Sequence, residues 1–103
     1  MPAFVKVADL SEIPAGTVKE VEANGKKIAL ANIDGLFYAI DNTCVHRGGP
    51  LGQGFLEGDL VECPWHGWQY NMKTGQCAFN PAARVPAYEV KTEGADVLVC
   101  LAD

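Results

Sequence analysis

Short apolar stretches alternate with turn residues about every ten positions along this chain, a spacing typical of an all-β domain. The first 40 residues predict four strands, at Phe4–Ala8, Thr17–Glu22, Lys27–Ile33 and Leu36–Ile40. The dipeptides Asn24-Gly25 and Asp34-Gly35 predict tight hairpins, because these residue types reach the left-handed backbone region easily. We therefore expect the four strands to form an antiparallel meander.

Alternate apolar positions give each expected sheet one face to bury, since successive side chains of a strand point to opposite faces. Such alternation occurs at Leu36, Tyr38 and Ile40 and again at Val97, Val99 and Leu101. The one helix-like stretch, Ser11–Pro14, contains a proline and predicts no more than a turn. We expect an antiparallel β-sandwich or a partly closed barrel, within one domain that spans residues 1–103.

The pattern changes between Asp41 and Gly75, where Arg47–Gly52 and Pro64–Trp68 are rich in glycine and proline and predict loops. Further strands are expected at Leu56–Cys63, Trp68–Asn71 and Gln76–Ala78. The two loops would meet at one tip, in a subdomain of about residues 41–83. Glycines there would let backbone N–H groups approach an inorganic group closely, because no Cβ atom stands in the way.

Each of these loops carries one cysteine and one histidine, in Cys44-Val45-His46 and, after sixteen intervening residues, in Cys63-Pro64-Trp65-His66. Thiolates and imidazoles bind zinc and iron, and ligand identity alone suggests four-coordinate zinc. Common zinc modules, however, pair cysteine with cysteine and histidine with histidine. A Rieske [2Fe–2S] cluster instead takes two cysteines on one iron and two histidines on the other, which suits the mixed pairs. The expected ligands are Cys44, His46, Cys63 and His66.

The full pattern, C-x-H-x16-C-x2-H with Gly48 and Gly67 after the two pairs, resembles the Rieske proteins. Over its whole length the chain resembles the small Rieske ferredoxins. The resemblance implies one Rieske [2Fe–2S] cluster, with the two cysteines on the inner iron and the two histidines on the outer, more exposed iron. It also implies that Asn80–Ala83 forms a proline-containing loop over the cluster.

The resemblance further implies a one-electron carrier that passes electrons from an NAD(P)H-dependent flavin reductase to a terminal oxygenase, and we expect a monomer. One alternative is a Rieske small subunit of a larger reductase, such as assimilatory nitrite reductase. Another is a zinc-stabilised interaction module without redox activity. The chain itself is not expected to be an enzyme. A Rieske oxygenase needs a further iron held by two histidines and a carboxylate, and the sequence has only two histidines.

The expected potential follows from departures from the higher-potential Rieske pattern. That pattern has loop cysteines, joined in a disulfide, where this chain has Gly49 and Trp65, and a cluster-bonding serine where it has Trp68. Tyr70 does occupy the tyrosine position of the pattern. Fewer donors to the sulfur atoms stabilise the reduced state less, so we expect a potential nearer about −150 mV than about +300 mV.

The formal net charge of −5, from 13 acidic and 8 basic residues, argues against a nucleic-acid partner, because phosphates are held by clustered Lys and Arg. No apolar run approaches the roughly 20 residues that a membrane span needs. The first residues lack the basic segment and apolar stretch of an export signal, so a cytoplasmic location is expected. Disulfides are rare there, and Cys77 and Cys100 are expected to be buried thiols.

The cluster tip is also expected to carry apolar side chains. These are Pro50, Leu51, Trp65 and Pro81. Two interpretations remain open for them. They form a docking patch around the histidines, or Trp65 and Leu51 fold over the cluster and exclude water.

Overall fold

The computed structural model describes residues 3–44, 49–65, 67–80 and 82–101, and its regular secondary structure there consists of strands and two single turns of 3-10 helix. The strands are β1 Ala3–Asp9, β2 Thr17–Ala23, β3 Lys26–Ile33, β4 Leu36–Asp41, β5 Phe55–Glu57, β6 Leu60–Glu62, β7 Gln69–Asn71, β8 Ala87–Tyr88, β9 Val90–Glu93 and β10 Asp96–Leu101. The 3-10 turns are η1 Leu10–Glu12 and η2 Leu51–Gln53. In this part of the chain no helix is long and apolar enough to cross a membrane.

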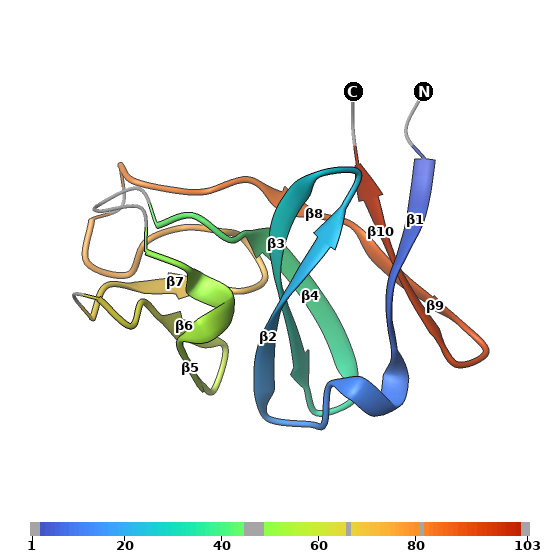
Figure 1. The fold of residues 1–103 in the computed structure, drawn as a ribbon. Coiled ribbons are helices and arrows are strands. Elements are labelled where there is room, and N and C mark those ends of the chain that lie inside the picture. The colour runs from blue at the N-terminus through green and yellow to red at the C-terminus, as the bar shows by residue number, and fades with distance from the viewer. Residues whose placement is uncertain (1–2, 45–48, 66, 81, 102–103) are drawn as a thin grey trace.

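The strands build three antiparallel sheets, in the orders β1-β10-β9, β2-β3-β4-β8 and β5-β6-β7. Figure 1 shows the β5-β6-β7 sheet at one end of the molecule, the β1-β10-β9 sheet at the other, and β2, β3 and β4 between them. This arrangement confirms the expected all-β, antiparallel fold class.

Strand β3 has a buried side chain on both of its faces, so it belongs to two cores. Ile28 and Leu30 pack with Val97 and Val99 of β10, in the core toward the β1-β10-β9 sheet. Ala29 and Ala31, on the other face, pack in the core that also contains Cys44, Cys63 and Tyr70. Alanine is small, so the β5-β6-β7 sheet and its loops can approach β3 closely on that side.

Both expected hairpins are present. Asn24 has φ 51° and Gly25 has φ 80°, while Asp34 has φ 55° and Gly35 has φ 90°. These left-handed conformations suit the tight antiparallel turns β2–β3 and β3–β4. The Ser11–Pro14 stretch gives no more than a turn, as expected, since the short η1 ends at Glu12.

Several strand predictions were wrong. The stretch Leu56–Cys63 is two strands, because Gly58 takes a left-handed φ of 59° and turns the chain between β5 and β6. The residues 76–78 make only isolated bridges, from Cys77 to Tyr70 and from Gln76 to Arg84. Leu36 is 63% exposed, although Tyr38 and Ile40 on the same face pack in a core, because Leu36 lies at the end of its strand.

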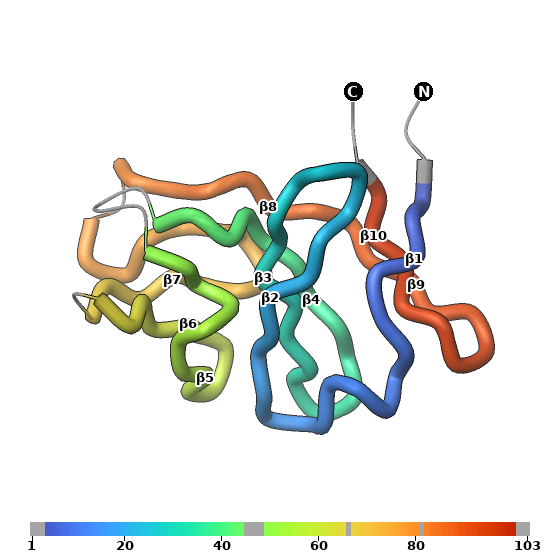
Figure 2. Tube along the Cα trace, viewed as in Figure 1, coloured from blue at the N-terminus to red at the C-terminus, as the bar shows by residue number. Residues whose placement is uncertain are grey.

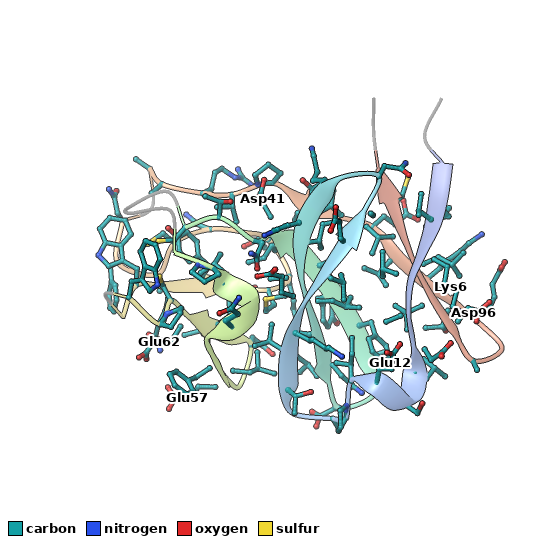
Figure 3. All side chains as sticks on the ribbon, in the orientation of Figure 1. Lys6, Glu12, Asp41, Glu57, Glu62 and Asp96 are labelled. Carbon is teal, nitrogen blue, oxygen red and sulfur yellow. The ribbon has the colours of Figure 1, made fainter. Side chains whose placement is uncertain are left out.

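Strand β1 also departs from the expected meander, since it pairs with β10 rather than with β2. Exposed ion pairs lie along this edge, with Lys6 Nζ 3.1 Å from Asp96 Oδ1 of β10 and 3.0 Å from Asp9 Oδ1 of its own strand. Hydrogen bonds to Asp9 and then Asp96 raise the pKa of Lys6. Figure 3 shows Lys6 and Asp96 at one end of the molecule and Glu57 and Glu62 at the other.

Candidate metal centre

Two loops bring the expected cysteine ligands into one buried region. The first loop is closed at its base by a bridge between Thr43 and Pro50, and the Cys44 N–H donates to the Gly49 carbonyl at 3.0 Å. In the second loop the Cys63 N–H donates to the Trp68 carbonyl at 2.7 Å. These bonds satisfy backbone groups that burial would otherwise leave unpaired, so each cysteine has a defined position.

The two loops lie against each other at Gly49. A Cβ atom added at Gly49 would lie 2.6 Å from Sγ of Cys63 and 3.1 Å from the ring of Trp65. A side chain therefore has no room there, and the backbone of the first loop lies directly beside the thiol of the second. The expectation that a loop glycine permits close backbone approach fits this contact.

Both thiols are nearly inaccessible to solvent, with Cys44 and Cys63 each 1% exposed. Sγ of Cys44 lies 3.2 Å from the hydroxyl oxygen of Tyr70 on β7, which is itself 0% exposed. When Cys44 is a thiolate it has no proton to give, so Tyr70 must be the donor. Tyr70 occupies the tyrosine position of the higher-potential pattern, and the structure places its hydroxyl beside Sγ of Cys44.

Two of the four expected ligands, His46 and His66, lie outside the described residues. The structure therefore gives the positions of the two cysteines only. Among the described residues no group of three or more Cys, His, Asp or Glu side chains is placed to hold a metal ion. The complete four-ligand set stays a prediction.

The apolar residues of the tip do not share one environment. Leu51 is fully buried in the core that contains both cysteines, which excludes it from an exposed docking patch. Trp65 is 58% exposed, although its ring lies beside Gly49. Pro50 is half-buried, and Pro81 lies outside the described residues.

None of the four cysteines, all of which the structure describes, forms a disulfide. Cys77 is buried, as expected, whereas Cys100 is only half-buried. The core around Cys44 and Cys63 includes Cys77, which packs there beside Tyr70.

Comparison with known proteins decides which kind of centre these loops hold. The family described as the Rieske [2Fe-2S] domain matches residues 3–92. The chain belongs to this family. A curated relative from Ralstonia sp, the ferredoxin component of the naphthalene 1,2-dioxygenase/salicylate 5-hydroxylase systems, is 38% identical over 97 residues, 93% of each chain. This Rieske protein therefore holds one [2Fe–2S] cluster, and the zinc interpretation loses its basis.

Solved structures agree with the assignment. In a complex of reduced oxygenase and oxidized ferredoxin in carbazole 1,9a-dioxygenase, the matched chain has a TM-score of 0.84 at 34% identity, with 93% of this chain and 91% of that chain covered. A putative NADH-dependent nitrite reductase small subunit from Mycobacterium tuberculosis has a TM-score of 0.92 at 18% identity, with 100% and 98% covered. At that identity the second likeness concerns the fold alone.

The described part of the site fits a Rieske cluster. Both thiols belong to one core and have little access to water, which suits the ligands of a buried iron. One of them has a hydroxyl donor within reach, and hydrogen bonds to sulfur ligands are common around such clusters. At Gly49 the missing side chain keeps the cysteine loops in contact.

One pair of residues in this region was missed by the sequence analysis. Asn42, two residues before Cys44, is 4% exposed and donates from Nδ2 to Glu20 Oε1 at 3.0 Å. The two residues are 22 positions apart, and neither belongs to a recognisable motif. Only the proximity of Asn42 to Cys44 could have drawn attention to it.

Proposed function

We propose that this chain is a Rieske ferredoxin that passes single electrons from a flavin-containing, NAD(P)H-dependent reductase to a terminal oxygenase. The observation that carries the proposal is the likeness to ferredoxin components of dioxygenase systems, which extends over 93% of both chains. Because the likeness covers 93% of that relative, it is not limited to the two metal-binding loops. The chain is an electron carrier rather than an enzyme.

In this proposal Cys44 and Cys63 hold the inner iron, and His46 and His66 hold the outer iron. The bound cluster supplies one-electron chemistry. The chain's own residues exclude water from the two thiols, since both are 1% exposed. Tyr70 donates to Sγ of Cys44, which lowers the electron density on that ligand and favours the reduced state.

The proposed partner face is the end of the molecule formed by the two loops. Trp65 is 58% exposed there, and Phe79, in the segment after β7, is 63% exposed. Glu57 and Glu62 lie at the same end of the molecule (Figure 3). Exposed aromatic side chains are enriched in protein interfaces. We further propose a monomeric carrier in the cytoplasm, where its reductase would draw on NAD(P)H.

An anaerobic, EPR-monitored redox titration of purified protein, together with metal analysis, tests the cluster and its role. We expect two iron atoms for each chain and a Rieske signal that appears on reduction by one electron. Colourless protein that contains zinc instead of iron would overturn the proposal. Co-elution of the native protein with one large reductase at a fixed ratio would contradict the free-carrier role and support the subunit alternative.

A further inference from the structure

The side chain of Asn42 connects the first cysteine loop to strand β2. Its Nδ2 donates to Glu20 Oε1 at 3.0 Å, and its Oδ1 accepts from the Gly52 N–H at 2.7 Å. Its backbone N–H donates to the Lys27 carbonyl at 3.3 Å, and its carbonyl accepts from the Leu51 N–H at 2.7 Å. Asn42 thus joins the start of the loop, the end of the loop and the neighbouring strands.

Glu20 on β2 binds both ends of this loop segment. Its Oε1 accepts not only from Asn42 but also from Gln53 Nε2 at 3.1 Å. Its Oε2 lies 3.7 Å from Lys27 Nζ. One carboxylate therefore connects the residue that precedes Cys44 by two positions with the turn η2 that follows the loop.

The polar contacts are supported by a close backbone approach at Gly52. A Cβ atom added there would lie 2.5 Å from Cα and 2.6 Å from the backbone nitrogen of Glu20. The turn η2 therefore lies directly on β2, and Figure 2 shows how the chain after residue 50 runs beside that strand. Substitution at Gly52 would force the two segments apart.

We propose that Asn42 and Glu20 form a clamp that positions the Cys44 loop, and that this clamp helps to set the reduction potential and the retention of the bound cluster. The inference rests on the proposed ligand role of Cys44. The clamp holds Asn42 and Gln53, which precede and follow the loop, while Cys44 within the loop contacts Tyr70 at 3.2 Å. Hydrogen bonds weaken steeply when distance or angle changes, so a loosened loop weakens the contact to Tyr70.

Asn42 acts here as a positioning residue. Because the donor at Tyr70 favours the reduced state, release of the clamp should lower the potential. It should also hold the Cys44 ligand less firmly, so that a chelator removes iron faster. Loss of one buried hydrogen bond corresponds to about a five-fold increase in the rate of cluster loss.

The test compares Asn42→Ala with Asn32→Ala in iron-loaded protein. Asn32 is the matched control because it is also a buried asparagine, 8% exposed, that donates to the Ile13 carbonyl and accepts from the Gly35 N–H, both at 2.8 Å. Both substitutions leave the net charge unchanged. We expect both variants to unfold at lower temperature, and only Asn42→Ala to lower the potential and release iron faster.

A double-mutant cycle with Tyr70→Phe separates positioning from other effects. If Asn42 acts through the contact between Cys44 and Tyr70, Asn42→Ala should shift the potential much less in the Tyr70→Phe background. An equal shift in both backgrounds would overturn the inference, as would an unchanged potential in Asn42→Ala.

The reciprocal exchange Asn42→Asp with Glu20→Gln keeps the net charge and restores a donor opposite an acceptor, so it should bring the potential back toward that of the parent.

Asn42→Ser serves if Asn42→Ala does not fold, because its hydroxyl is too short to reach Glu20 but leaves a smaller gap. The same lowered potential and faster iron release are expected, and parent-like values would overturn the inference.

Cys44→Ser distinguishes the two proposals. If Cys44→Ser keeps a parent-like cluster, the ligand assignment fails and the inference fails with it. If it loses the cluster while the Asn42 variants match the parent, only the clamp is wrong.

Discussion

The hydroxyl oxygen of Tyr70 lies 3.2 Å from Sγ of Cys44, and both side chains are buried. The contact joins the first cysteine loop to β7, a strand that follows the second loop. It is therefore at once a packing contact between the two halves of the site and the hydrogen bond expected to act on the cluster's sulfur ligand.

Replacing Tyr70 with Phe should lower the potential, because the reduced cluster carries more negative charge and loses a donor. If one hydrogen bond contributes about 1 kcal/mol more to the reduced state, the shift for one electron is about 40 mV. An EPR-monitored titration of the variant measures it. An unchanged or raised potential would show that the hydroxyl does not donate to Cys44.

Gly49→Ala tests the contact between the two loops. The added Cβ would lie 2.6 Å from Sγ of Cys63, so the thiol or the loop must move, and iron content after purification should fall well below that of the parent. Gly94→Ala is a suitable control, since Gly94 has φ 60° and nothing within 4 Å of the added atom. Its backbone strain should reduce stability by about 1 kcal/mol without loss of iron. Equal iron content in both variants would refute the loop contact.

The local parts of this fold could be predicted from the sequence. The hairpins at Asn24-Gly25 and Asp34-Gly35 follow from the preference of these two adjacent residues for left-handed backbone conformations. The cysteine and histidine pairs predicted the kind of metal centre for a similar reason, since ligand type and spacing are local. The position of Cys44 beside Tyr70 adds a long-range contact that only the family pattern hinted at.

Contacts between distant segments could not be predicted in this way. The pairing of β1 with β10 depends on how two sheets close on each other, which the alternation within either strand does not specify. Both faces of β3 are buried, so its sequence does not alternate between apolar and polar residues. Alanine is apolar whether it faces a core or a nearby backbone, so it does not indicate which face is which. Nothing in the sequence indicates the contact between Asn42 and Glu20 either, because polar residues of these types are usually exposed.

Tyr88 offers a stability prediction away from the metal centre. Its hydroxyl oxygen is buried and has no hydrogen-bond partner within the part of the chain that the structure describes. A buried polar group without a partner destabilises a protein, so Tyr88→Phe should raise the free energy of unfolding by about 1 kcal/mol. Thermal unfolding of the iron-loaded protein measures the change. The variant should keep the parent's reduction potential, which makes it a matched control for Tyr70→Phe. A lower unfolding temperature than that of the parent would mean that the Tyr88 hydroxyl does have a partner.

The potential of the unmodified protein should lie in the lower part of the Rieske range, nearer about −150 mV than about +300 mV. Gly49 and Trp65 occupy the positions where the higher-potential pattern has a disulfide. The structure brings them together, since a Cβ atom at Gly49 would lie 3.1 Å from the Trp65 ring. These two residues cannot form a covalent link, so contact alone holds the loops together at this point. Tyr70 remains as a donor, which should keep the potential above that of its Phe variant. A titration midpoint clearly above zero would contradict this assignment and would place the protein with high-potential electron carriers.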